Sequence, residues 1–139
     1  PGEPLKPLGS VASGGEISRV MLAVKTVLAD EEDTPTLIFD EIDTGISGIT
    51  AGKVGDRLRL IGKSRQVICI THLPQIAATA DHHFLIRKKA EGTSVRTDVE
   101  MLDEAASVEE LARLLGGANV TERVMESAKE LKELAKCER

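Results

Sequence analysis

Two adjacent carboxylates, Asp40 and Glu41, follow directly after the apolar run 36–39. A Gly/Ser-rich turn that ends in Ser47 and Gly48 comes next. Acids at the tip of a strand suit metal binding and proton transfer, because one carboxylate takes Mg²⁺ while its neighbour stays free. The alternative is a strand that ends in a solvated acidic turn, and the pair by itself leaves both interpretations open.

The helix start Ser13-Gly14-Gly15-Glu16 is a second candidate site. Ser13 with Glu16 three residues later forms a capping box ahead of apolar residues at helical spacing, which predicts a helix from Gly14 to about Ala29. Two glycines in the first turn are poor helix formers and need another reason to be there. Glycines at a helix N-terminus let an anion approach the free backbone N–H groups. The sequence predicts a phosphate contact here, beside the simpler interpretation that Ser13 only caps the helix.

A histidine, His72, directly follows a second apolar run, 66–71. That run predicts a buried strand, and Pro74 predicts a short helix that reaches about Ala80. A single histidine is more often structural than functional. Because open α/β sheets bind their ligands at the carboxyl ends of parallel strands, a histidine at this place favours a functional role.

An α/β arrangement is required to position these residues. The runs 36–39 and 66–71 both have apolar centres, 37–39 and 67–70, as do short strands that a parallel sheet buries on both faces. Apolar spacing predicts a helix between them that ends at Gly62. Beyond the second strand, 82–89 and 94–102 are expected to form an antiparallel hairpin.

The last third of the chain is predicted to be helical. Ser107, with Glu110 three residues later, matches another capping box, which predicts a helix through Leu115. Thr121 is expected to cap a final helix that ends at about Lys136, with Glu and Lys at four-residue spacing.

Composition narrows the class of protein. With 139 residues, 41% apolar and 29% charged, the chain is predicted to be one globular domain, 1–139, with an extended Pro-rich lead-in over 1–10. A net charge of −5 and only two aromatic residues argue against a basic nucleic-acid surface that stacks single-stranded bases.

Two cysteines without a signal peptide fit a reducing cytoplasm, and no apolar run approaches the roughly 20 residues that span a bilayer. Because the sequence starts at Pro1 without Met, a fragment of a longer protein is expected.

Three other features are interpreted as structural. The tripeptide 62–64 is like the end of a phosphate-binding P-loop, but Arg57 stands where that motif needs a glycine, and the tripeptide follows a helix rather than a strand. His82 and His83 are neighbours on a strand and point to opposite faces, so they are not expected to form a metal pair. The basic cluster 87–89 is interpreted as a solvated strand end rather than a DNA contact.

Together these motifs occur in the order of signature motif, Walker B acids, D-loop and switch histidine in an ABC-type ATPase. The segments 12–19, 39–48 and 70–77 closely resemble the RecN family of bacterial DNA double-strand-break repair ATPases, which are related to SMC proteins. The lead-in and the stretches 81–83 and 114–117 also resemble it, so the resemblance covers nearly the whole chain. It implies the C-terminal lobe of an ABC/SMC-like head: a short, mainly parallel sheet with flanking helices, a β-hairpin and C-terminal helices.

The resemblance implies a role for each residue at the strand tips. Asp40 would help to hold Mg²⁺, Glu41 would polarise the water that attacks the γ-phosphate of ATP, and His72 would contact that phosphate. A second group would contact a nucleotide held by the partner subunit of a head-to-head homodimer. This group consists of Ser13, Gly14, Gly15, Glu16, Ser47 and Gly48. Glu16 would also stabilise the helix start, and the turn from Asp43 to Gly48 would lie along the dimer seam, where this chain has Ser47 in place of the Asp of many ABC proteins.

Parts of the head that the resemblance implies lie outside this chain, namely an N-terminal lobe with its P-loop and a long coiled coil. The isolated chain is therefore expected not to hydrolyse ATP, and to expose an apolar face that favours self-association. In the full-length protein the resemblance implies ATP-dependent head dimerisation on DNA, in the cytoplasm at the nucleoid, with no membrane partner.

Two alternatives stay open at this point. One is the head of another SMC-like or ABC ATPase, although Ile42 after Glu41 disfavours a membrane transporter, where a Glu-Pro pair is common. The other is a non-catalytic dimerisation or DNA-docking module that keeps the motifs as a scaffold.

Overall fold

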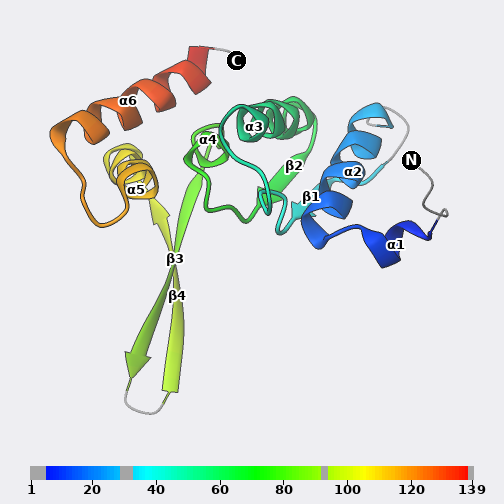
Figure 1. The fold of residues 1–139 in the computed structure, drawn as a ribbon. Coiled ribbons are helices and arrows are strands. Elements are labelled where there is room, and N and C mark those ends of the chain that lie inside the picture. The colour runs from blue at the N-terminus through cyan, green and yellow to red at the C-terminus, as the bar shows by residue number, and fades with distance from the viewer. Residues whose placement is uncertain (1–5, 29–32, 92–93, 138–139) are drawn as a thin grey trace. The chain divides into compact units, whose positions relative to one another are not determined.

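The computed structural model describes residues 6–28, 33–91 and 94–137. Its elements in chain order are α1 (Leu8–Val11), α2 (Gly14–Val27), β1 (Thr36–Phe39), α3 (Gly48–Gly62), β2 (Gln66–Cys69), α4 (Pro74–Ala77), β3 (His83–Glu91), β4 (Ser94–Leu102), α5 (Glu104–Gly116) and α6 (Glu122–Cys137) (Figure 1). The chain divides into two compact units, Pro1–Ile76 and Ala77–Arg139. Each unit is described by itself.

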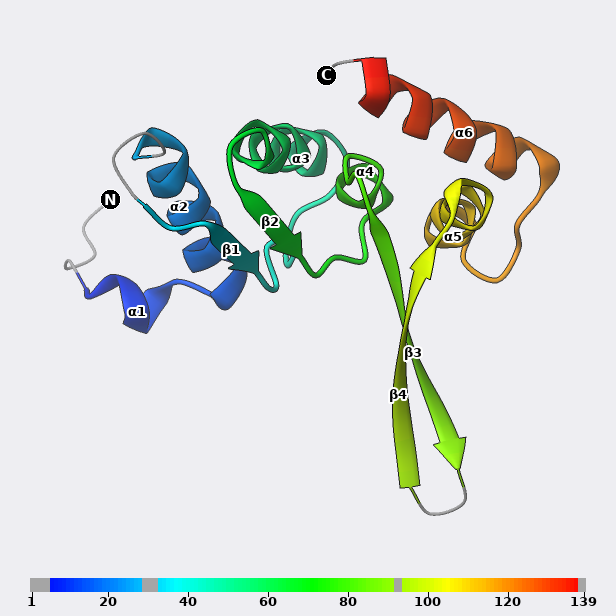
Figure 2. The same ribbon diagram turned by 180° about the vertical axis from the view of Figure 1, so that it is seen from behind.

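The first unit is built on a parallel pair of strands. β1 pairs with β2 so that Phe39 lies opposite Cys69, and the Ile70 N–H donates to the Phe39 carbonyl at 2.9 Å. Figure 2 shows the two arrows side by side and pointing the same way. The predicted parallel pair is confirmed, and the residues that follow the two strands meet at one edge of the sheet.

Helices α2 and α3 cover one face of this pair. Leu37 and Phe39 point into a core with side chains of both helices, among them Leu22 of α2 and Leu58 and Ile61 of α3. The opposite face carries apolar side chains in solvent, and Ile38 on it is 68% exposed. The prediction that β1 is buried on both faces is wrong, because in the described part of the chain helices α2 and α3 cover one face of the pair and leave the other exposed. The expected exposed apolar face is present.

Most predicted boundaries in the first unit hold to within a few residues. α2 begins at Gly14 and ends at Val27, and α3 ends at Gly62, as the spacing indicates. α4 is shorter than predicted and ends at Ala77. The Ala80 N–H bonds the Ala77 carbonyl as a single turn beyond it.

The predicted extended lead-in differs from the structure over its last part. Residues 8–10 lie in the short helix α1, and both the N–H and the hydroxyl of Ser10 donate to the Pro7 carbonyl, at 2.9 and 2.7 Å. Proline is preorganised for the start of a helical turn, and the serine closes it. Residues 1–5 lie outside the described part of the chain.

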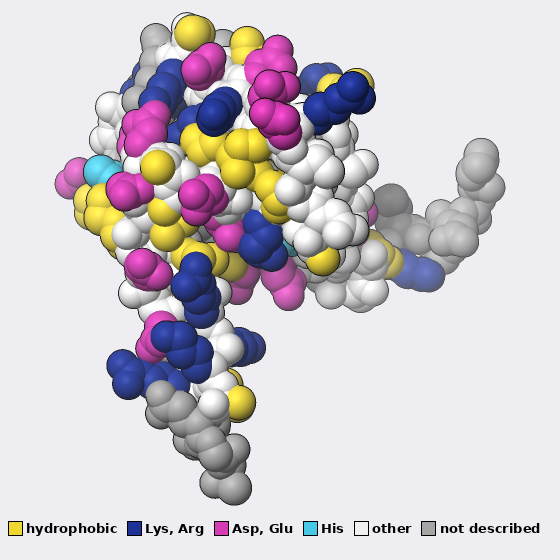
Figure 3. All heavy atoms as spheres, turned by 90° about the vertical axis from the view of Figure 1, so that its left-hand side faces the viewer, with side chains coloured by type: hydrophobic (Ala, Val, Ile, Leu, Met, Phe, Trp, Pro, Cys, Tyr) yellow, Lys and Arg dark blue, Asp and Glu magenta, His cyan; other side chains and the backbone are white. Residues whose placement is uncertain are grey.

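The second unit begins with the predicted antiparallel hairpin, in which His83 of β3 lies opposite Leu102 of β4. Exposed apolar side chains at alternate positions of the two strands share one face of the hairpin. They are Phe84, Ile86, Val95, Val99 and Met101. The other face carries cross-strand ion pairs, including Lys89 with Asp98 at 2.9 Å. Figure 3 shows Lys and Arg side chains gathered along the hairpin. The pairing supports the interpretation of 87–89 as a solvated strand end. Residues 92–93, which lie between the two predicted strands, are outside the described residues.

The predicted cap of the next helix is wrong. α5 begins at Glu104, and Asp103 is its N-cap, with its carboxylate accepting from the Ala106 N–H at 2.8 Å. Ser107 is buried one turn inside the helix and hydrogen-bonds His83 Nδ1 at 3.0 Å. Asp103 directly follows β4, and aspartate caps a helix as well as serine does. The helix therefore has its N-cap four residues before the predicted cap, Ser107.

The last helix follows its prediction. α6 begins at Glu122, and the Thr121 hydroxyl accepts from the Val124 N–H at 3.4 Å. Leu111 and Ala112 of α5 pack with Ala128 of α6 in the core of the second unit. Within the described residues, no helix combines the length and apolarity needed to cross a membrane.

Candidate functional site

The two carboxylates lie on a strained turn at the carboxyl end of β1. Asp40 accepts the Glu41 N–H through Oδ1 at 2.8 Å, and the Thr44 N–H donates to the Glu41 carbonyl at 3.0 Å. Glu41 has a φ of +56°, in the left-handed region that a residue with a side chain rarely adopts. Such a conformation costs about 1–3 kcal/mol and is found most often at functional sites. Both side chains are exposed.

The first turn of α2 packs directly on this acidic turn. A Cβ added to Gly14 would lie 2.6 Å from Glu41 Oε2. A Cβ added to Gly15 would lie 2.8 Å from the Glu41 carbonyl oxygen and 2.9 Å from that of Thr44. These distances explain the two glycines in a way that the sequence alone did not reveal. A Cβ at Gly15 would meet backbone atoms of the turn, and a Cβ at Gly14 would meet the end of the Glu41 side chain.

Polar side chains of α2 hold the two segments together. The Ser18 hydroxyl donates to the Asp40 carbonyl at 3.0 Å. Arg19 Nη1 donates to the Ile42 carbonyl at 3.1 Å and to the Thr44 carbonyl at 2.8 Å. The candidate phosphate-binding helix start and the candidate catalytic turn are therefore one connected substructure within the same chain.

The predicted capping box at the start of α2 is confirmed. The Ser13 N–H and hydroxyl both donate to Glu16 Oε2 at 2.8 Å, and the Glu16 N–H donates back to Ser13 Oγ at 3.4 Å. These bonds, helped by the nearby charge of Arg19, hold the pKa of the Glu16 carboxyl below its usual value. Glu16 thus stabilises the helix start, as expected.

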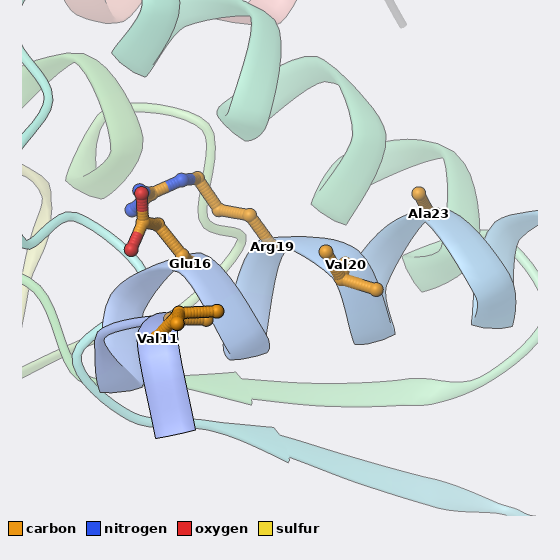
Figure 4. A pocket seen from close by; sticks show the side chains of 6 residues that line it. Val11, Glu16, Arg19, Val20 and Ala23 are labelled. Atoms are coloured by element: carbon orange, nitrogen blue, oxygen red, sulfur yellow. The ribbon is translucent and has the colours of Figure 1, made fainter. Parts of the chain in front are cut away.

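A shallow groove of about 590 Å³ runs along α2 next to this start. It is lined by Val11, Ala12, Glu16, Arg19, Val20 and Ala23. Figure 4 shows Glu16 and Arg19 projecting at the same end as Val11, with Val20 and Ala23 farther along α2. The groove joins a charged end near the candidate site to an exposed apolar side of α2.

Asp43 links the two strand tips. It is only 3% exposed, and its Oδ2 accepts from the Thr71 hydroxyl at 2.7 Å, from the His72 N–H at 2.7 Å and from His72 Nδ1 at 2.9 Å. Burial by itself raises the pKa of this carboxyl, but the bonds from Thr71 and His72 outweigh it and lower the pKa below its usual value. The His72 side chain is 72% exposed. Sequence reasoning placed Asp43 only in the turn at the dimer seam and missed this contact.

The structure places Ser47 and Gly48 at the far end of the same turn. Ser47 is the N-cap of α3, with an exposed side chain that makes no cap hydrogen bond. Gly48 has a φ of +49°, which favours glycine. These two residues are therefore on the surface, on the segment that continues directly from Asp43.

The carboxylates that follow β1 fit an Mg²⁺ ion that is held jointly with substrate phosphates better than a metal ion bound by protein side chains alone. Across the described ranges, no cluster of three or more His, Cys, Asp and Glu side chains is placed to hold a metal ion. Mg²⁺ keeps several water ligands and is held by one or two carboxylates together with substrate phosphates. The exposed Asp40 at the tip of β1 matches that requirement.

Cys69 lies beside the acids but is not a nucleophile. Burial and the neighbouring negative charges of Asp43 and Asp40 raise the pKa of its thiol to about 12. The reactive form of cysteine is the thiolate, so this thiol is inert near neutral pH.

The charge on Asp43 should make stability depend on pH. Because the folded pKa lies below the unfolded value of about 3.9, Asp43 stabilises the fold above that pH, and this contribution is lost as the pH falls through the folded pKa. We expect Asp43→Asn to lower the free energy of unfolding by about 1–2 kcal/mol near pH 6 and by much less near pH 2. Urea unfolding followed by circular dichroism measures this, with the exposed Asp33→Asn as control. An equal loss at both pH values would contradict the interpretation.

Comparison with known proteins identifies the family of the chain. No family model matches the chain. The DNA repair protein RecN of Halalkalibacterium halodurans is 51% identical over 135 residues, which is 97% of this chain and 24% of that protein. The RecN proteins of Vibrio cholerae and Bacillus subtilis are 50% and 45% identical, each over 94% of this chain, and the matches cover 24% and 23% of their respective lengths. The chain thus spans about a quarter of the length of these curated relatives.

A solved structure shows the fold. It comes from work described as "Structural biochemistry of ATP-driven dimerization and DNA stimulated activation of SMC ATPases". The superposition has a TM-score of 0.55 at 19% identity and covers 85% of this chain and 70% of that chain. The α/β fold is therefore that of an SMC ATPase head. By sequence, the chain belongs to the RecN family and matches the C-terminal portion of its members.

Proposed function

We propose that this chain is the C-terminal lobe of a RecN-type head that binds and hydrolyses ATP with Mg²⁺ in the full-length protein. One observation carries the proposal. The parallel pairing of β1 with β2 puts Asp40-Glu41 and His72 at one edge of the sheet, where Asp43 bridges them. Exposed groups at the carboxyl ends of parallel strands are the place where such sheets bind ligands.

The strand-tip residues have distinct proposed roles. Glu41 takes up the proton of the attacking water, and its strained backbone sets the point from which the side chain projects. His72 presents its exposed ring to the γ-phosphate. Asp40 holds Mg²⁺, which when bound would neutralise phosphate charge.

The start of α2 is proposed to bind the γ-phosphate of a nucleotide held by the partner subunit of a homodimer. Ser13 and Gly14 are exposed, and the unpaired N–H groups at the start of a helix favour an anion. Ser47 and Gly48 are exposed on the turn that would lie along the same seam.

The remainder of the full-length protein is proposed to cover the apolar surfaces of this chain. Ile38, Ile68 and Ile70 stand exposed on the open face of the sheet, and Val24 and Val27 on α2. An N-terminal lobe with its P-loop fits the sheet face, because a parallel sheet is normally covered on both sides. ATP-dependent dimerisation of heads on DNA is proposed for that full-length protein, in line with the DNA repair names of the relatives.

One observation favours a scaffold without catalysis as the second candidate. The capping box and the close approach of Gly14 and Gly15 to the acidic turn explain these residues without a nucleotide. A non-catalytic dimerisation or DNA-docking module would keep them for folding alone. It would have no need of the Glu41 carboxylate.

Steady-state ATP hydrolysis by two proteins tests the proposal. The full-length family member that contains this chain is expected to hydrolyse Mg-ATP. The 139-residue chain alone is expected not to, because its described residues offer no loop that holds the α- and β-phosphates. An inactive full-length protein, or an isolated chain whose activity disappears in Glu41→Gln, would each contradict it.

A further inference from the structure

We propose that Asp43 is the positioning residue of His72, an inference that rests on the proposed function. Three donors from the chain after β2 converge on one oxygen of its carboxylate, Oδ2. They are the Thr71 hydroxyl, the His72 backbone N–H and the His72 ring nitrogen Nδ1, all within 2.9 Å. An acid of the turn after β1 thereby sets the place and orientation of a histidine 29 residues later.

The pairing fixes which ring nitrogen of His72 faces outward. A carboxylate only accepts hydrogen bonds, so the 2.9 Å contact requires the proton on Nδ1 and directs that atom inward. Nε2 is then the ring atom left for a ligand. The burial contrast agrees, since Asp43 is 3% exposed while the His72 side chain is 72% exposed.

Two further contacts make Asp43 a fixed point rather than a mobile partner. The Thr71 hydroxyl also accepts the Leu73 N–H at 3.1 Å, so the loop 71–73 is organised around Asp43. On the other side, Arg19 of α2 donates to the carbonyls of Ile42 and Thr44, the residues before and after Asp43. The α2 start, the acidic turn and His72 are thus joined by hydrogen bonds on either side of the backbone of residues 42–44.

Many functional histidines donate one ring N–H to a carboxylate, which sets the tautomer and the orientation of the ring. This arrangement gives Asp43 that role for His72. Asp43 itself is buried and contacts His72 rather than a ligand. Its effect should therefore appear in turnover more than in substrate binding.

Kinetics of the full-length protein test the role. Asp43→Ala should lower kcat by about 10–100-fold with little change in KM, and Asp43→Asn, which keeps one acceptor oxygen, should recover much of this loss. His72→Ala should lower kcat by a similar factor, and the double variant should be no worse than either single one. Asp33→Asn, an equivalent change on an exposed residue, should leave kcat as it is.

The tautomer of His72 gives a readout that a purely structural role would not move. Nitrogen-15 NMR of the unsubstituted chain should show His72 carrying its proton on Nδ1 when the ring is neutral, and Asp43→Ala should shift this toward Nε2. The measurement on the unsubstituted chain does not depend on whether the variants fold. A neutral ring protonated on Nε2 in the unsubstituted chain would overturn the inference.

The outcomes separate this inference from the proposed function. If Glu41→Gln abolishes hydrolysis while Asp43→Ala folds and turns over normally, the positioning role is wrong and the function stands. If both Asp43→Ala and His72→Ala reduce kcat and their effects multiply, the two residues act independently and the role is again wrong. If Glu41→Gln leaves hydrolysis intact, the proposed function itself fails.

Discussion

Glu41→Gln in the full-length protein is expected to lower kcat for ATP hydrolysis by about 100-fold or more, since loss of a general base typically costs a factor of 10²–10⁴. The amide has the shape of the carboxylate but does not accept a proton. Glu41 is exposed on its turn, and its backbone bond from Thr44 does not involve the side chain, so the fold should persist. ATP should still bind, and the variant should accumulate as an ATP-bound dimer.

Turnover assays together with the nucleotide content of the purified dimer measure this effect. Glu109→Gln on α5 is the matched control, because Glu109 is an exposed glutamate in the second unit. A Glu41→Gln protein that turns over ATP at the unsubstituted rate would favour the scaffold alternative.

Gly15→Ala is expected to lower the free energy of unfolding of the chain by about 2 kcal/mol, as overpacking of close contacts does. The added Cβ would meet the carbonyl oxygens of Glu41 and Thr44 at 2.8 and 2.9 Å. Both are backbone atoms of a turn already held by Arg19, so neither moves without breaking hydrogen bonds. Urea unfolding followed by circular dichroism at 222 nm reports the loss.

Two other glycine-to-alanine changes control for helix propensity. Gly52→Ala in α3 meets nothing within 4 Å and should stabilise the chain by up to about 1 kcal/mol. Gly14→Ala meets only the end of the Glu41 side chain, which can rotate away, so it should spare the fold and reduce ATP turnover in the full-length protein. Equal stabilities for Gly15→Ala and Gly52→Ala would show that the close approach does not exist.

Local sequence signals accounted for the elements that position the site. The Ser13–Glu16 capping box starts α2 where it was predicted, and the two apolar runs form the parallel pair. Such features depend on residues a few positions apart, so a single sequence carries them. The prediction of Ser107 as the N-cap of α5 was wrong because Asp103 can cap a helix equally well. The path of the chain after β4 determines which of the two residues is the cap.

Contacts between distant segments could not be predicted. The bonds of Asp43 to Thr71 and His72 join residues 28 and 29 apart, and those of Arg19 to the acidic turn join residues 23 and 25 apart. No local pattern marks them. The glycine pair was ambiguous for the same reason, since a close approach of protein backbone and a close approach of phosphate both call for a missing Cβ.

The open sheet face shows a different limit. The last three residues of β1 are all apolar, so the sequence predicts burial on both sides, yet Ile38 is exposed while Leu37 and Phe39 are buried. The sequence is suited to an assembly with a second covering layer, and the described chain provides only one. This mismatch between pattern and burial is the physical sign of a surface that a further part of the protein would cover.

The most direct test of the central claim is the ATPase rate of an equal mixture of two inactive full-length variants, Ser13→Asp and Glu41→Gln. If the α2 start acts on the nucleotide of the partner subunit, half of the dimers are mixed, and each of these has one site free of both changes. The predicted rate is then about a quarter of the unsubstituted one, given free exchange between symmetric dimers. If both motifs act within one subunit, every site carries one change, and a mixture that stays inactive would contradict the account.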